Sequence, residues 1–175
     1  MARNIEIKAR IASVAQLLPH AQAVAGGGAP QLIEQDDTFF KVPQGRLKLR
    51  QFADGSAELI HYHRPDTGDA KASDYVRVAA PEPAALREAL VRACGLRGRV
   101  QKRRWLLLAQ NGAFQTRIHL DQVQGLGDFM ELEVVLQDGQ TDAQGAAVAE
   151  ALMDALGLAE VPRLAGSYLD LLAAA

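Results

Sequence analysis

Charged residues alternate with apolar residues in several short segments of this chain, so that like charges recur at every second position. Glu131 and Glu133 are separated by one leucine, and Arg46, Lys48 and Arg50 are separated by single leucines. Successive side chains of a strand point to opposite faces, so each of these sets lies on one face. Two carboxylates spaced about 6 to 7 Å apart suit a shared cation, and grouped cations suit an anion. The residues therefore predict a polar cavity that binds an anion and a cation together.

The same alternation recurs along the chain, at residues 4–11, 46–50, 58–64, 100–104, 115–121 and 129–135, and more weakly at 75–78. A sheet with one solvated face also alternates, but its charges are normally of mixed sign, because like charges on adjacent positions repel. Here the cations gather in some segments and the acids in others. This separation favours a closed barrel of about eight strands, lined with charge and covered outside by helices. For each acid, and for Glu58 in particular, an ion pair with an arginine is the alternative interpretation.

Turn-forming and capping residues divide the chain into these elements. Asn111-Gly112 predicts a hairpin between residues 105–109 and 114–121. The capping box at Thr141 and Gln144 predicts a helix that ends at Gly157. Further helices are expected to begin at Ser13, with Pro19 straining the interior, and over residues 81–95 and 167–173.

The composition of the 175 residues is that of an ordinary globular domain, with 49% hydrophobic and 23% charged residues. One domain over residues 1–175 is expected. The net charge of −2 gives no general attraction for nucleic acid or an anionic membrane. A single cysteine, Cys94, and the absence of a long apolar segment predict a cytoplasmic protein that does not enter the membrane. The apolar residues 171–175 are compatible with a homodimer.

The charged segments also resemble a known family, the CYTH domain or triphosphate tunnel metalloenzymes. Asn4-Ile5-Glu6-Ile7-Lys8 is similar to the ExExK signature of this family. The other similar segments follow in the family's order over nearly the whole chain, at residues 37–40, 45–50, 62–65, 102–104, 117–121, 126–133 and 167–172. The chain most resembles the class IV adenylate cyclase branch. The resemblance implies a mainly β, α+β fold, a closed eight-stranded antiparallel barrel with helices packed outside, whose tunnel binds a triphosphate and a divalent metal ion.

The resemblance also implies roles for particular residues. The divalent ion, Mg²⁺ or Mn²⁺, would take oxygen ligands from Glu6, Asp121, Glu131 and Glu133. The triphosphate would be bound by Lys8, Arg46, Lys48, Arg50, Arg64, Lys102, Arg104 and Arg117. Catalysis would depend on Glu6, Lys8, Glu131 and Glu133. His61 and His119 are interpreted as structural or peripheral, because Mg²⁺ prefers oxygen ligands.

Asn4 departs from the signature, since it stands at the position of the first glutamate. Its side chain offers a carbonyl oxygen without a charge, so one metal position is expected to be weaker. The first functional hypothesis is an adenylate cyclase that converts ATP to cyclic AMP and pyrophosphate. An inorganic or thiamine triphosphatase needs the same cations and acids, and Asn4 favours a third alternative, a non-catalytic nucleotide- or polyphosphate-binding module. No residue that would recognise adenine can be identified, so these alternatives stay open.

Overall fold

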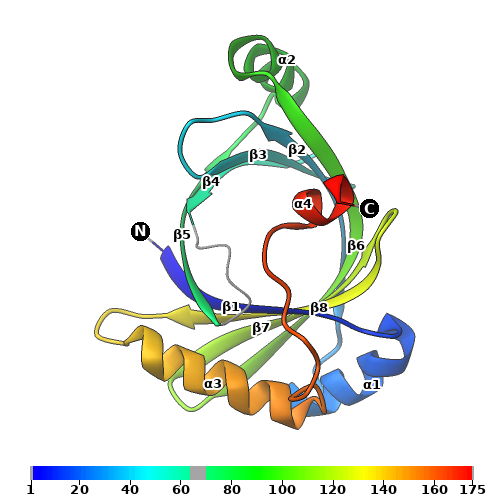
Figure 1. Cartoon of the computed structure of the whole chain (residues 1–175), viewed down its shortest axis with the longest axis vertical. Coiled ribbons are helices and arrows are strands. Elements are labelled where there is room, and N and C mark those ends of the chain that lie inside the picture. Colours follow the sequence, from blue (N-terminus) through cyan, green and yellow to red (C-terminus); the bar gives the residue numbers. More distant parts are fainter. Residues whose placement is uncertain (1, 64–69, 175) are drawn as a thin grey trace.

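The chain folds into a closed antiparallel β-barrel, as seen in a computed structural model that describes residues 2–63 and 70–174 (Figure 1). The described strands are β1 (Ala2–Arg10), β2 (Gln31–Phe40), β3 (Arg46–Phe52), β4 (Ala57–His63), β5 (Lys71–Ala79), β6 (Leu96–Asn111), β7 (Phe114–Val123) and β8 (Gly127–Leu136). Around the barrel they follow the order β1-β5-β4-β3-β2-β6-β7-β8, and β8 pairs with β1 to close it. The predicted eight-stranded barrel is confirmed.

The turns that join these strands depend on local sequence. β6 and β7 form the predicted hairpin, in which Asn111 pairs with Phe114 across a two-residue loop. Gly112 occupies this loop with a φ of +59°, a conformation that side chains other than glycine rarely adopt. The hairpin keeps Arg104 opposite Asp121 and places both on the inner face of the barrel.

Four described helices pack outside the barrel or at its end, namely α1 (Val14–Val24), α2 (Pro83–Cys94), α3 (Asp142–Ala155) and α4 (Tyr168–Ala173). α1 and α3 lie beneath β7 and β8, whereas α2 lies on the opposite side (Figure 1). α1 continues through Pro19, although this residue cannot donate a backbone hydrogen bond to the preceding turn. The predicted capping box of α3 is present, because Thr141 and Gln144 exchange hydrogen bonds.

The main hydrophobic core lies outside the barrel wall, between the strands and the two lower helices. Ile5 and Ile7 of β1 and Leu132 of β8 point away from the tunnel and are almost completely buried. Burial of such a side chain contributes about 1.5–3 kcal/mol. α3 approaches this layer closely, since a Cβ atom on Gly145 would lie 2.7 Å from Ile5. The alternating strands therefore place their apolar side chains under the helices and their polar side chains in the interior.

α4 lies across one end of the barrel (Figure 1). Tyr168 and Leu169 pack against a second cluster formed by Phe39, Val100 and Phe129. Leu171 and Leu172 pack against the same cluster, so part of the apolar C-terminal segment is used within the chain; the homodimer stays a prediction. Among the described helices, none combines the length and hydropathy that a membrane crossing would need.

Candidate functional site

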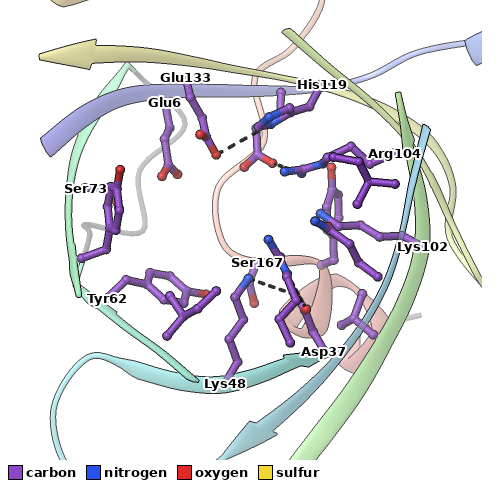
Figure 2. Close-up of a pocket in the computed structure, with 18 of the residues that line it drawn as sticks. Glu6, Asp37, Lys48, Tyr62, Ser73, Lys102, Arg104, His119, Glu133 and Ser167 are labelled. Carbon is purple, nitrogen blue, oxygen red and sulfur yellow. Dashed lines mark hydrogen bonds and ion pairs between the residues drawn. The ribbon is translucent and has the colours of Figure 1, made fainter. Parts of the chain in front are cut away.

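A cavity of about 330 Å³ occupies the interior of the barrel. Its volume falls in the range of small-molecule sites. Side chains from all eight described strands line it, together with Ser167 and Tyr168 at the α4 end. Figure 2 shows two walls of different character, with acids at β1 and β8 and most cations at β3 and β6. The strands thus bring into one space the residues that the sequence separates by more than 100 positions.

The acidic wall is formed by Glu6 of β1 and by Glu131 and Glu133 of β8. In the strand register Glu6 stands opposite Glu133, and Lys8 stands opposite Glu131. The Lys8 Nζ atom lies 3.7 Å from Oε1 of Glu131. The carboxylates of Glu6 and Glu133 both point into the cavity (Figure 2). Three of the four predicted metal ligands therefore share this wall, and among them Glu131 and Glu133 have donor atoms within 4.8 Å of one another.

His119 of β7, which the sequence analysis interpreted as structural or peripheral, also lines this wall. It stands opposite Glu131 in the register, and its Nδ1 atom lies 3.7 Å from Oε1 of Glu133. Donor atoms of His119, Glu131 and Glu133 all lie within 4.8 Å of one another. Burial, and next the nearby Arg104 cation, lower the pKa of His119 well below its ordinary value. The imidazole is therefore neutral near pH 7 and retains a nitrogen lone pair.

This donor set fits a divalent metal ion. Nδ1 of His119 and Oδ1 of Asn4 are buried and have no hydrogen-bond partner within the described residues. A buried polar atom without a partner costs about 1–3 kcal/mol, so each atom needs an explanation. Both line the cavity beside the acids, where carboxylate, carbonyl and imidazole ligands suit a divalent ion. The metal roles of Glu6, Glu131 and Glu133 remain predictions that this fit supports.

On β2 and β3, Asp37 holds two of the predicted phosphate-binding cations in place. Its carboxylate accepts hydrogen bonds from Lys48 Nζ at 2.9 Å and from Nε and an NH2 nitrogen of Arg50, each at 2.7 Å. Burial alone would raise the pKa of Asp37, but Arg50 and Lys48 lower it far below its ordinary value. Asp37 is therefore ionised, and it fixes the two cations at the cavity wall.

Asp121 plays a similar part on the neighbouring wall. It is completely buried, and it accepts hydrogen bonds from Lys102 at 3.0 Å, from two Arg104 nitrogens at 2.7 Å, and from the Tyr168 hydroxyl at 2.9 Å. Burial would raise the pKa of Asp121, but Arg104 and Lys102 lower it well below its ordinary value. The structure brings Asp121 together with these cations and not into the group of His119, Glu131 and Glu133. Its predicted role as a metal ligand stays a prediction.

Two of the lysines that line the cavity, Lys48 and Lys102, are less firmly charged than lysines in water. Burial, followed by the Arg104 cation, lowers the pKa of Lys102 to about 7. Burial, followed by the Arg50 cation, lowers the pKa of Lys48 to about 8. Arg104 stays charged, because Asp121 and Glu131 outweigh the effect of burial and raise its pKa. An anion that enters the cavity would favour the protonated form of both lysines.

The remaining predicted cations occupy different places. Arg117 lines the cavity and donates a hydrogen bond to Oε2 of Glu133 at 3.2 Å. Arg46 lies at the α4 end, where it donates to Asp170 at 2.9 Å. Arg64 lies outside the described residues. Arg46 therefore contacts α4, the helix that lies across one end of the barrel, and does not line the cavity.

Asp37 and His119 are two of the residues of the site that were not assigned to it from the sequence. Asp37 shares its strand face with Gln35 and Phe39, and His119 shares its face with Arg117 and Asp121. The alternation of polar and apolar residues along these two strands indicated that both side chains point to the inner face of the barrel. It gave no indication that Asp37 would bind the cations or that His119 would lack a hydrogen-bond partner.

Solved structures with this fold come from archaea, bacteria and plants. The PH1012 protein of Pyrococcus horikoshii superposes with a TM-score of 0.82 at 22% identity, covering 96% of this chain and 98% of that one. A proposed adenylate cyclase of Vibrio parahaemolyticus superposes with a TM-score of 0.75 at 20% identity, and the superposition covers 97% of each chain. A third structure is the proposed adenylyl cyclase HpAC1 of Hippeastrum, which is described as having a dominant triphosphatase activity. It superposes with a TM-score of 0.68 at 13% identity, covering 99% of this chain and 96% of that one. At these identities the likeness concerns the fold.

Sequence comparison identifies the family directly. No curated protein gives a significant match to the chain. The sequence profile of the CYTH domain, in contrast, matches residues 2–168 and so includes every strand of the barrel. The chain belongs to the CYTH domain family.

Proposed function

We propose that this protein is a metal-dependent enzyme that acts on a triphosphate, and that it is an adenylate cyclase of the class IV type. The observation that carries the proposal is one cavity in the barrel interior in which cations held by ion pairs face a group of acids and a neutral imidazole. Cations alone would bind an anion. The opposing acids provide for a divalent ion that bridges to the same anion.

The cationic wall would bind the phosphates. Arg50 and Arg104 present planar donor groups that suit phosphate oxygens, and Lys48 and Lys102 add point charges. Asp37 and Asp121 hold these side chains before a ligand enters, so little ordering is needed on binding. A divalent ion at the acidic wall would polarise phosphate oxygens and lower the pKa of an attacking hydroxyl group. Glu131 and Glu133 of this chain would hold that ion.

In the cyclase reaction the ribose 3′-hydroxyl of ATP loses its proton to water and its oxygen forms a bond to the α-phosphorus. The bond from that phosphorus to the oxygen bridging to the β-phosphorus breaks, and pyrophosphate leaves with this oxygen. Lys102 and Arg104 would stabilise the charge that develops on the leaving group. Apolar side chains also line the cavity, among them Ile33, Phe52 and Leu106. Inorganic triphosphate needs no such surface, whereas a nucleoside does, and this favours a nucleotide substrate.

A triphosphatase is the second candidate. The same residues would then direct water to the terminal phosphorus and release orthophosphate. This alternative is supported by the structural similarity to HpAC1, because that protein's description states a dominant triphosphatase activity. Both candidates require the acidic and the cationic wall, so the reaction products must decide between them.

The test is to incubate the purified protein with ATP, tripolyphosphate or thiamine triphosphate and Mg²⁺ or Mn²⁺, and to identify the products by ³¹P NMR and chromatography. Cyclic AMP with pyrophosphate supports the cyclase. Orthophosphate would replace the cyclase by the triphosphatase, and binding without turnover would leave a non-catalytic binding module.

A further inference from the structure

We propose that His119 supplies a nitrogen ligand to the metal ion of this site and that it makes the site prefer first-row transition ions, such as Mn²⁺ and Co²⁺, to Mg²⁺. The inference rests on the proposed function, because it assumes that the acidic wall holds a divalent ion. It concerns the specificity of that wall, for which the ExExK signature and the paired glutamates give no indication.

The position of His119 is the first argument. Only 4% of the residue is exposed, and the side chain projects from β7 into the cavity toward Glu133 (Figure 2). The 3.7 Å between its Nδ1 atom and Oε1 of Glu133 is too long for a hydrogen bond. Two donors bound to one ion at about 2.1 Å are about 3 Å apart when adjacent and about 4.2 Å apart when opposite. The observed separation lies within this range.

The orientation of the two glutamates is the second argument. Oε2 of Glu131 accepts a hydrogen bond from Arg104 at 2.8 Å, and Oε2 of Glu133 accepts one from Arg117 at 3.2 Å. These arginines orient the two carboxylates. Oε1 of Glu133 is thereby directed toward the imidazole of His119. Outer hydrogen bonds of this kind commonly orient the ligands of a metal ion.

The alternative is a histidine that serves the packing of the core, and its buried ring nitrogens would be expected to find hydrogen-bond partners, as Nε2 does even in the exposed His20 and His61. His20 contacts the Ala155 carbonyl through Nε2 at 2.8 Å, and His61 contacts the Gln44 carbonyl at 3.2 Å. Nδ1 of His119 is more deeply buried than either side chain and has no hydrogen-bond partner within the described residues. A metal ion would supply the missing partner.

The ligand type determines the expected preference. Mg²⁺ binds oxygen ligands and keeps several waters, whereas imidazole nitrogen binds first-row transition ions more strongly. Among the described residues that line the cavity, His119 is the sole histidine. His119 would therefore be the residue that supplies the imidazole nitrogen ligand on which the metal preference depends.

The direct test is pulsed EPR of Mn²⁺ bound to the wild-type protein, prepared without a polyhistidine tag and in a buffer without nitrogen ligands. The proposal predicts echo modulation from a directly bound ¹⁴N nucleus. Bound Mn²⁺ without this modulation would overturn it. The measurement needs no variant, so a loss of folding cannot obscure the answer.

The preference is tested by titrating Co²⁺ and Mg²⁺ into wild type, His119→Asp and the control His20→Asn, at a single pH of about 8, above the ordinary pKa of histidine. His119→Asp replaces the nitrogen by an oxygen ligand. Its affinity for Co²⁺ should fall about tenfold or more relative to that for Mg²⁺, since even the loss of a hydrogen-bond partner that orients a metal ligand commonly costs about 10- to 100-fold in metal affinity. His20→Asn should match wild type. Equal changes for the two metals would contradict the proposal.

The two levels of the hypothesis fail in different ways. If Mn²⁺ binds and supports turnover but shows no ¹⁴N modulation, the role of His119 is wrong while the proposed function stands. If neither metal binds, with or without tripolyphosphate, the metal-dependent function itself is wrong, and the role of His119 with it.

Discussion

Charged side chains of the tunnel neutralise one another in ion pairs. Asp121 pairs with Lys102 and Arg104, and Asp37 pairs with Lys48 and Arg50. Each carboxylate offsets part of the repulsion between two adjacent cations, and each cation keeps further donor positions that a phosphate can use. The same ion pairs that prepare the site for an anion therefore also stabilise the fold.

The first prediction concerns Asp121→Asn, which removes the charge and keeps the shape of the side chain. The free energy of unfolding, measured with urea at neutral pH, should fall by about 3–5 kcal/mol, because two buried cations lose their counter-ion. The control Glu88→Gln disrupts only an exposed pair with Arg92 and should cost less than about 1 kcal/mol. Equal costs for the two variants would refute the structural role of Asp121.

Asp121 also determines in which direction the free energy of unfolding changes with pH. The pKa of Asp121 in the folded protein lies below its ordinary value of 3.8. The stabilisation is therefore complete above the ordinary pKa and is lost as the pH falls below it. Asp121→Asn should remove this part of the acid sensitivity.

The second prediction uses Lys48, whose pKa is lowered to about 8. Only protonated Lys48 attracts an anion, so its contribution to tripolyphosphate affinity should fall about tenfold between pH 7 and pH 9. Lys48→Arg retains its charge over this range and should show a correspondingly smaller fall. Titration calorimetry of both proteins separates the effect from the titration of the ligand itself. Parallel pH profiles would show that Lys48 does not contact the anion.

At the level of single residues, the sequence indicated which side chains face inward but not which of them interact. Glu131 and Glu133 could be assigned to one face because strand alternation determines it. The partners of Asp121 could not be assigned, since they come from β6 and α4 and meet only when the barrel is closed. The same reason applies to His119, whose missing hydrogen-bond partner is a property of the assembled wall.

Among the elements, α4 connects the end of the chain to the tunnel. Its N-terminus is capped by Ser167 and Asp170, whose side chains each accept a hydrogen bond from the backbone of the other. Asp170 also pairs with Arg46 at 2.9 Å and with Arg97 at 2.8 Å. A helix of six residues is too short to be stable alone, so these contacts hold it across the barrel end.

The third prediction follows for Asp170→Asn. Loss of the carboxylate weakens the cap and both ion pairs, and a cap of this kind contributes about 1 kcal/mol. Hydrogen exchange of the backbone amides in residues 167–174 should become faster. Asp142→Asn, at the start of α3, is the control and should leave these amides unchanged. Unaltered exchange in Asp170→Asn would show that the apolar contacts of Leu169 alone fix α4.

Element by element, local signals were good predictors. The capping box at Thr141 correctly predicted the start of α3, because the hydrogen bonds involved lie within four residues. The short helix expected over residues 167–173 is present as α4, and the structure adds a capping box at Ser167 that had not been predicted. The effect of Pro19 was harder to judge from local sequence. α1 continues through it, and Val14 and Ala21 on either side are buried against the barrel, so packing maintains the helix.

For the molecule as a whole, closure of the barrel creates the candidate site. The net charge of −2 does not indicate how the charges are distributed, because cations and acids occupy separate walls of the interior. Alternation predicts the two faces of each strand, but the closing pair of β1 with β8 joins residues that are 119 or more positions apart. Without the family resemblance, the sequence therefore suggested a barrel and left its strand order open.

The most direct test of the tunnel as a metal-dependent triphosphate site is the rate of ATP turnover in Glu131→Gln/Glu133→Gln, compared with wild type at saturating Mn²⁺. Two amides bind a divalent ion far more weakly than two carboxylates, while the cations of the opposite wall are unchanged. We predict that the rate of turnover falls at least about 100-fold relative to wild type. Circular dichroism should show that the double variant keeps the wild-type fold. Turnover at the wild-type rate in the folded double variant would contradict the account.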